Sequence, residues 1–334
     1  MKIVDFMQER GIVYDDVKEN SKALGRKPTP VRFNRNFAYI IAIYMEGVYT
    51  SIGIVNILGD VIFSREIEIS NAEQFIQKDF YKYIDSTILQ SAVEREKLIG
   101  IGIALPVAVD YAGKKVLRAP LFRETHLENL PIILERLGTL YSLPVFVEND
   151  VNSAAYGEYR QIYSESTDNL IYISLGSGVG SGIILNKEIW KGQNSSAGEI
   201  GYMIFEKNRS FPQDGPGWLE SKINFTALQE SFNINIQNII PKQTKQKIAR
   251  YFAKYLSLSI LNMYVVLDIQ TVVLGGKLTE YLSDVLIDEV YREMRAISSL
   301  MPQLVYGSLK KPGFSGLSYL IADKLLDQIL TVSS

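Results

Sequence analysis

Apolar positions along the chain form continuous runs that alternate with amphipathic stripes. The runs predict strands at residues 12–14, 39–43, 50–58, 61–69, 98–104, 145–147, 170–175 and 271–274. Apolar residues spaced three and four apart predict helices at residues 2–10, 71–95, 127–141, 243–267 and 316–330. Because strands alternate with helices, the pattern indicates an α/β fold.

Turn residues divide this pattern into units. Gly47 and the pair Gly59-Asp60 separate the first three long runs, which predicts an antiparallel meander of three strands. Pro28 and Pro30 exclude a continuous helix at this point and predict a linker between a short N-terminal segment and the body.

Composition narrows the class of protein. With 334 residues, 47% of them hydrophobic and 22% charged, the chain is long enough for two globular domains. No apolar run reaches the roughly 18 residues of a membrane span, and charges interrupt the first residues, so we predict a cytoplasmic protein. Zero cysteines and a single histidine, His126, argue against disulfides, thiolate zinc sites and a Ser-His-Asp triad.

The net charge of −2 is unevenly distributed. Residues 1–36 carry eight Lys or Arg and five Asp or Glu, a net charge of +3. This excess is too small to indicate nucleic-acid binding without a DNA-reading element.

A glycine-rich segment follows the predicted strand at 170–175. Glycines at alternate positions allow tight turns with free N–H groups that suit a phosphate, although a glycine hairpin without a ligand is an equal alternative. Gly275 and Gly276 follow another strand and resemble this segment more weakly. The candidate phosphate-binding glycines are Gly176, Gly178, Gly180, Gly182, Gly275 and Gly276.

Carboxylates at the ends of strands and in glycine-rich surroundings are candidate ligands for sugar hydroxyls. Asp150, beside Asn149, follows a strand and could accept a hydroxyl proton in phosphoryl transfer. Either residue could instead cap a helix at 151–160. Glu199 and Glu220 could accept hydrogen bonds from sugar hydroxyls, although a solvated Glu is the commoner case.

Taken together, these segments resemble the ROK family of repressors and sugar kinases. The motifs are PVFVENDVNSAAYGE at 144–158, ISLGSGVGSGIILNKEIWKGQNSSAGEIGYM at 173–203 and VVLGG at 272–276. The resemblance implies an actin-like ATPase fold with two α/β lobes and a cleft between them. It implies one lobe of residues 37–148 plus 316–334, and a second lobe of residues 149–315 that dimerises.

The N-terminal segment is similar to the part of ROK repressors that joins a DNA-binding winged helix to the body. Residues 1–36 match the end of a recognition helix, a wing and a linker, and they leave the first two helices of such a domain unmatched. The resemblance implies weak phosphate contacts from the wing residues Lys18, Lys22, Arg26 and Lys27.

Two departures from the family pattern argue against kinase activity. Tyr44 stands at the position of a metal-facing Asp, and Glu46 stands at the position of a close-approach Gly in the phosphate motif. Loss of the carboxylate and a new negative charge near a triphosphate both oppose phosphoryl transfer. We therefore predict no catalytic residues and no cofactor.

The zinc ligands of the family are also replaced. Its one His and three Cys correspond to Tyr202, Phe211, Gln213 and Trp218, so we predict that no metal binds. The replaced His is also a sugar contact in the family, which makes Tyr202 a candidate effector residue beside Asn149, Asp150, Glu199 and Glu220.

Three functions fit these features. The first is a transcriptional regulator of the xylose-repressor type that binds DNA and a sugar or amino-sugar effector as a homodimer. The second is an antirepressor that binds another regulatory protein, as in a staphylococcal offshoot of the family. The third, which Tyr44 and Glu46 disfavour, is an ATP-dependent sugar kinase.

Overall fold

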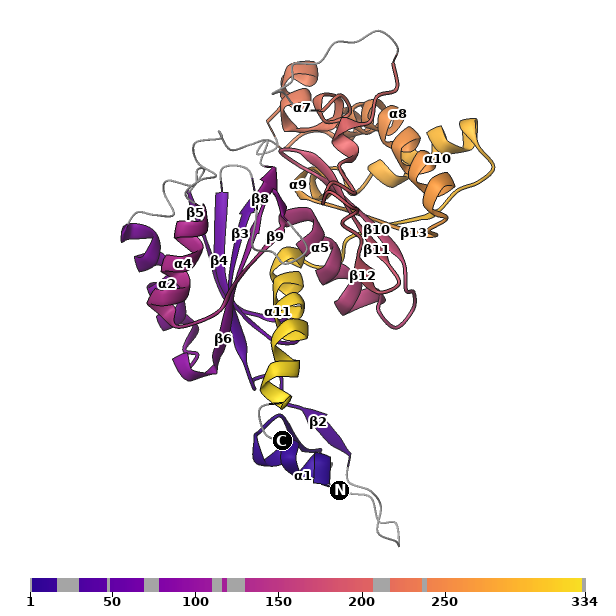
Figure 1. The fold of residues 1–334 in the computed structure, drawn as a ribbon. Coiled ribbons are helices and arrows are strands. Elements are labelled where there is room, and N and C mark those ends of the chain that lie inside the picture. Colours follow the sequence, from indigo (N-terminus) through magenta and orange to yellow (C-terminus); the bar gives the residue numbers. More distant parts are fainter. Residues whose placement is uncertain are drawn as a thin grey trace, which may run out of the picture.

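The computed structural model describes residues 2–16, 30–46, 49–68, 78–109, 116–118, 130–206, 217–235 and 239–331. These residues contain two five-stranded sheets, each with helices on both faces (Figure 1). The strands of the first sheet, in spatial order, are β5 (Val61–Glu68), β4 (Tyr49–Asn56), β3 (Tyr39–Glu46), β6 (Leu98–Leu105) and β9 (Val145–Asn149). The predicted antiparallel meander is confirmed as β3-β4-β5, and β6 and β9 add to it in parallel.

The second sheet repeats this topology. Its strands, in spatial order, are β12 (Glu188–Ile189), β11 (Val179–Leu185), β10 (Leu170–Leu175), β13 (Thr271–Gly275) and β14 (Gln303–Tyr306). An antiparallel meander, β10-β11-β12, is again extended by two parallel strands. The predicted α/β fold with two lobes is therefore confirmed.

Helices cover both faces of each sheet. The outer faces carry α2 (Lys78–Ser91) and α4 (Leu130–Tyr141) on the first sheet, and α8 (Lys242–Leu267) and α10 (Leu286–Ile297) on the second. Between the sheets lie α5 (Asp150–Glu158) and α11 (Pro312–Thr331), as Figure 1 shows. A two-stranded sheet of β7 (Ala108–Val109) and β8 (Val116–Arg118) and several short helices complete the two lobes.

Among the helix ends that the structure describes, two lie four residues from their predicted positions. The helix predicted at 71–95 ends at Ser91, because Ala92 adopts a left-handed backbone with φ of 56°. The terminal helix begins at Pro312 instead of 316, since proline suits the first turn of a helix. Residues 71–77 and 127–129 lie outside the described residues, so those helix starts stay predictions.

Burial on two faces explains the continuous apolar runs. In β3, Ile41 and Ile43 pack under α2 and α4, whereas Ile40 and Ala42 pack against α11. A strand covered on both faces needs apolar side chains at successive positions, which removes the alternation seen in half-exposed sheets.

Glycines allow α5 and α11 to cross in direct contact. A Cβ on Gly316 would lie 1.7 Å from the Ser153 carbonyl oxygen, and one on Gly157 would lie 2.0 Å from that of Pro312. At the same crossing the Ser153 hydroxyl donates to the carbonyl of Gly313 over 2.7 Å. This crossing fixes the start of α5, where two predicted site residues lie.

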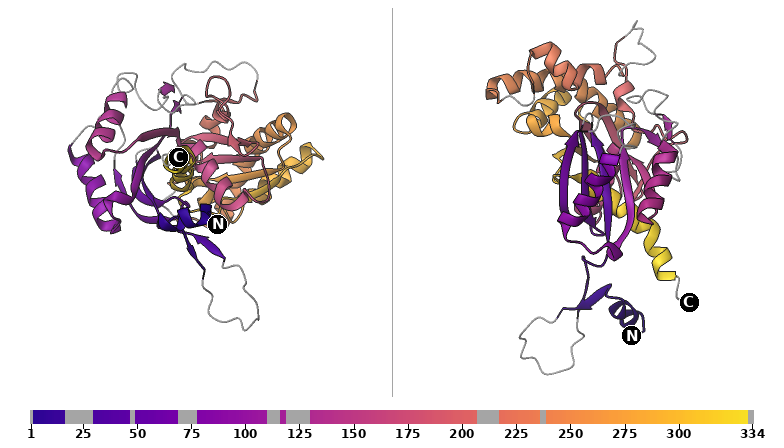
Figure 2. Two further views of the ribbon diagram at one scale, coloured as in Figure 1. Left: turned by 60° about the horizontal axis from the view of Figure 1, so that its bottom comes forward. Right: turned by 90° about the vertical axis from the view of Figure 1, so that its left-hand side faces the viewer.

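The N-terminal segment projects from the end of the body at which α11 ends (Figure 2). It contains α1 (Lys2–Glu9) and an antiparallel pair, β1 (Val13–Asp15) and β2 (Val31–Phe33). The pairing extends through Phe33, so residues 31–33 form a strand where the sequence indicated only a linker. The four basic wing residues lie outside the described residues, and the assignment to a winged helix stays a prediction.

Among the helices of the described residues, none combines the length and the apolar character needed to cross a bilayer.

Candidate functional site

The start of α5 places Asn149 and Asp150 in the lining of one cavity, to which residues of both sheets contribute. Asn149 ends β9 and caps the helix: its Oδ1 accepts the Asn152 N–H over 2.9 Å, and its Nδ2 donates to the Val107 carbonyl over 3.2 Å. The capping alternative from the sequence is thus confirmed for Asn149. Asp150 is the first residue of the helix and lines the same cavity as Asn149.

Burial makes the Asp150 carboxyl group a weaker acid than an exposed aspartate. Desolvation raises its pKa to about 7, with contributions in the same direction from the carboxylates of Glu46 and Glu199. Backbone N–H groups at Val151 and Asp150 itself act in the opposite direction. Near neutral pH this side chain can therefore hold or release a proton, as a hydroxyl acceptor requires.

The glycine-rich turn is shorter than the sequence indicated. Gly176 and Gly178 form the turn between β10 and β11, where the Gly176 N–H donates to the Gly178 carbonyl over 3.0 Å. Gly180 and Gly182 instead pair with β10 as part of strand β11. A Cβ on Gly182 would lie 2.3 Å from the Cβ of Ala155, so this glycine makes room for α5.

Glu220 supports this turn from the opposite side. It begins the short helix α6 (Glu220–Ile223), and its Oε2 accepts the Val179 N–H over 2.9 Å. Burial raises the pKa of Glu220, while the Val179 N–H lowers it and Glu199 raises it.

Glu199 is held by the segment that follows β12. Gly198 has φ of 88° and accepts the Ser181 N–H with its carbonyl over 2.8 Å, which fixes the backbone beside Glu199 against β11. Tyr202 ends the 3-10 helix η4 (Ile200–Tyr202) and is 37% exposed.

The five predicted effector residues line one cavity of about 350 Å³, which we call the effector cavity. The tertiary structure adds residues that sequence reasoning missed: Pro106, Val107 and Val109 from the end of the first sheet, Ser195 and Ala197 beside Glu199, and Asn224 and Thr226. Asn224 caps α7 (Phe225–Phe232), accepting the Ala227 N–H over 2.8 Å, a role that an Asn before a helix could have signalled.

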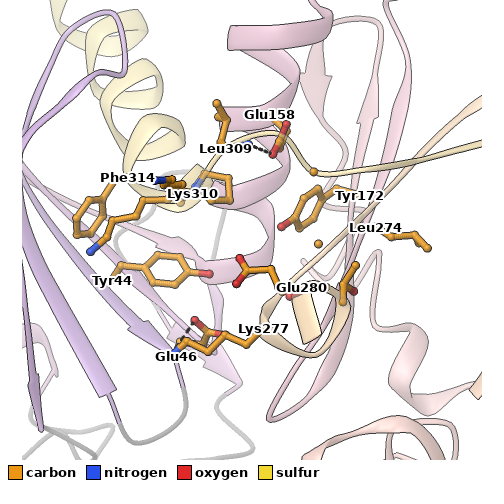
Figure 3. Close-up of a pocket in the computed structure, with 18 of the residues that line it drawn as sticks. Tyr44, Glu46, Glu158, Tyr172, Leu274, Lys277, Glu280, Leu309, Lys310 and Phe314 are labelled. Carbon is orange, nitrogen blue, oxygen red and sulfur yellow. Dashed lines mark hydrogen bonds and ion pairs between the residues drawn. The ribbon is translucent and has the colours of Figure 1, made fainter. Parts of the chain in front are cut away.

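A second cavity of about 380 Å³ adjoins the first and contains Gly275 and Gly276. We call it the rear cavity. Its lining combines carboxylates with lysines: Glu46, Glu66, Glu158, Glu280, Lys277, Lys310 and Lys311. Figure 3 shows Tyr44 entering it from the side of β3, with Lys277 and Glu280 facing it from the opposite lobe.

Lys277 spans the rear cavity. It begins α9 (Lys277–Tyr281) in the second lobe, and its Nζ lies 4.0 Å from carboxylate oxygens of Glu46 and Glu66 in the first. Burial raises the pKa of Glu46, whereas Lys277 lowers it and Glu280 and Glu66 raise it. The charge that Glu46 introduces is thus partly balanced by an ammonium of the same chain.

Tyr44 lines both cavities and lies at their junction. A Cβ on Gly313 would lie 2.1 Å from its ring, and the ring of Phe314 packs against it edge-on at 6.4 Å. The start of α11 therefore holds the Tyr44 ring in place.

One of the replaced zinc positions is filled by an aromatic cluster. Trp218 is 2% exposed and packs edge-on against Phe205 and Tyr255, with ring centroids 5.7 and 5.6 Å apart. Phe211 and Gln213 lie outside the described residues. No cluster of potential metal ligands occurs in the described part of the chain.

The sequence model of the ROK family matches residues 40–313, which include nearly all of both sheets and of the lining of both cavities. The chain belongs to the ROK family.

Individual ROK proteins show the same relationship over most of the chain. The xylose repressor of Bacillus subtilis is 26% identical over 98% of this chain and 88% of its own length. Alignments with several other curated xylose repressors span about half of those relatives' length.

Solved ROK structures share the fold. A ROK transcriptional regulator homologous to the Escherichia coli MLC protein superposes with a TM-score of 0.75 at 19% identity, covering 98% of this chain and 89% of that one. A ROK glucokinase of Streptomyces griseus, solved with glucose and AMPPNP, gives 0.68 at 21% identity, covering 85% and 99%. Both regulators and kinases therefore use this two-lobed body.

Proposed function

We propose that this chain is a transcriptional regulator whose cleft binds a sugar-like effector and does not transfer phosphate. The relatives that match it over its whole length support regulation, since they are a xylose repressor and a ROK transcriptional regulator. The convergence of Asn149, Asp150 and Glu199 on one cavity supports effector binding.

The position of Tyr44 is the main support for the proposal that this chain does not transfer phosphate. A phosphoryl donor in the rear cavity and a hydroxyl acceptor at Asp150 would have to meet where the two cavities adjoin, and Tyr44 lines both cavities there. In-line transfer requires the reacting atoms about 3–3.5 Å apart, and a bulky ring between donor and acceptor would oppose this approach. Glu46 and Glu280 add negative charge where a triphosphate would lie.

The same cavity arrangement favours a role for the effector in positioning the lobes. Residues from both sheets line the effector cavity, so a ligand there contacts both lobes at once. A ligand that prefers one lobe arrangement shifts the population toward it in proportion to that preference. Such a shift would be transmitted through the N-terminal segment and would alter its contacts with DNA or with a partner protein. We also expect the body to form a homodimer.

A ligand titration tests the effector site. Thermal shifts are measured with hexoses and hexosamines, for the unmodified chain and for Asp150→Ala. Loss of a charged hydrogen bond is expected to weaken binding by about 10- to 150-fold. If no sugar shifts the melting temperature, the proposed effector function is wrong.

DNA binding is tested by gel shift with the 334-residue polypeptide, an operator of a xylose-type regulon and a scrambled duplex. We expect weak binding that falls steeply with salt, because the wing residues provide phosphate contacts without base contacts. A specificity ratio of about 10³ or more would contradict this expectation.

A further inference from the structure

The charged side chains that line the effector cavity in the described residues are all carboxylates, although Lys277 approaches one of them, Glu46, from the rear cavity. The lining of the effector cavity contains four carboxylates, Glu46, Asp150, Glu199 and Glu220. Among the described residues that line it, none is Lys, Arg or His. The remaining polar groups are neutral amides and hydroxyls, which suit a sugar but do not offset the charge.

The carboxylates lie close enough to influence one another. Glu46 and Glu199 both raise the pKa of Asp150, and Glu199 raises that of Glu220. They reach the cavity from β3, α5, the segment after β12 and α6, so elements of both lobes bring the charges together. The cavity between these elements, and not the carboxylates alone, defines the site.

Three lysines on segments that adjoin the cavity contact other side chains from outside it. Lys191 is buried under the cavity with its Nζ 2.7 Å from Glu148 Oε2. Lys277 contacts Glu46 from the rear cavity at 4.0 Å, and Lys222 lies over the Trp218 ring at 5.5 Å. None of the three lines the effector cavity.

We propose that the effector cavity selects a positively charged ligand, an amino sugar with a free ammonium group, over neutral hexoses and anionic sugars. This inference rests on the proposed effector function and specifies the ligand of the same site. An ammonium among several carboxylates in a partly desolvated cavity is attracted electrostatically and donates charge-assisted hydrogen bonds. A sugar phosphate or a uronic acid meets the same carboxylates as like charges and is excluded.

Glu46 contributes specifically to this selection. It stands where the family pattern has glycine, and a Cβ on Gly176 would lie 3.5 Å from Glu46 Oε1, so its carboxylate faces the glycine turn. Replacing it by Gln removes one charge while keeping the shape of the cavity. Glu66 offers a matched control, because Lys277 contacts it at the same 4.0 Å distance and it lines only the rear cavity.

Isothermal titration calorimetry at neutral pH tests the inference with matched probes of gluco, galacto and manno configuration. Each set comprises the 2-amino sugar, its N-acetyl form and the parent hexose, with glucose 6-phosphate and glucuronate as anionic probes. We expect at least one amino sugar to bind about tenfold or more tightly than its two neutral counterparts. Glu46→Gln should reduce this preference several-fold, and Glu66→Gln should retain it.

The outcomes separate the two proposals. If a neutral hexose, an N-acetyl sugar or an anionic sugar binds as tightly as the amino sugars, the charge selection is wrong and the effector site stands. If an amino sugar is preferred but Glu46→Gln retains the full preference, the selection by Glu46 is wrong. If no probe binds, the effector site and its charge selection both fail.

Discussion

Lys191 Nζ lies 2.7 Å from Glu148 Oε2, and the two side chains are only 8% and 6% exposed. Glu148 belongs to β9 in the first sheet, whereas Lys191 follows β12 in the second, so the ion pair joins the lobes beneath the effector cavity. Glu148 Oε1 also accepts the Asn149 N–H over 3.0 Å. The pair therefore connects the residue that caps α5 with the segment that carries Glu199.

Lys191→Met is expected to lower the free energy of unfolding by about 3–5 kcal/mol, because it leaves a buried carboxylate unpaired. Urea denaturation measures the change. Lys187→Met, which removes an exposed ion pair with Asp168, provides the control and should cost less than about 1 kcal/mol. Equal effects for the two variants would show that the buried pair has no special role.

The crossing of α5 and α11 predicts a strong steric effect. Gly316→Ala should destabilise the chain by several kcal/mol, on the order of 3, because its Cβ would overlap the Ser153 backbone oxygen. Gly138→Ala in α4 is the matched helical control, since its Cβ would have ordinary contacts at 3.4 and 3.6 Å and alanine favours helix. The prediction fails if both variants melt together with the unmodified chain.

The raised pKa of Asp150 should make the free energy of unfolding depend on pH. Its pKa is raised from 3.8 in a model compound to about 7 in the folded protein, so the folded state retains a proton that the unfolded chain loses above pH 4. The free energy of unfolding therefore falls as the pH rises from about 4 to 7. Asp150→Asn removes this dependence and should be more stable than the unmodified chain at neutral pH, by up to about 4 kcal/mol.

Urea denaturation at a series of pH values measures this difference. The gain from Asp150→Asn should disappear below pH 4, where the unmodified side chain is protonated in both states. A difference that is constant with pH would mean that Asp150 is solvated and ionised normally.

Tyr44 at the junction of the cavities predicts that ATP is not turned over. A coupled assay with hexoses and N-acetylhexosamines should show no phosphorylation. Turnover near ~1 per second, an ordinary enzyme rate, would contradict the assignment of Tyr44 and Glu46 to the phosphate motif.

Because Trp218 occupies a position where the family has a zinc ligand, we expect an aromatic cluster, instead of a metal, to stabilise this part of the second lobe. Trp218→Ala should cost about 3–5 kcal/mol because it leaves a large buried cavity, whereas Trp190→Ala, at a residue 49% exposed, should cost far less. Elemental analysis of the unmodified chain should find no stoichiometric zinc. One zinc per chain would overturn the alignment of residues 202–218.

The order of apolar runs and amphipathic stripes was enough to predict the α/β class, the β3-β4-β5 meander and the position of α8. These features depend on local periodicity, which each segment carries by itself. The glycine and carboxylate motifs, in their order, were enough to identify the family resemblance and to group the five residues that line the effector cavity.

Only the tertiary structure decided which glycines form a turn and which make room for a helix. Gly182 looks like a turn residue in the sequence, but its neighbour in space is Ala155 of α5. The repeated topology of the two sheets, the bridge from Lys277 to Glu46 and the ion pair of Glu148 with Lys191 likewise join segments far apart in the chain. Such pairings depend on how the helices and sheets pack, and no local pattern of residues encodes them.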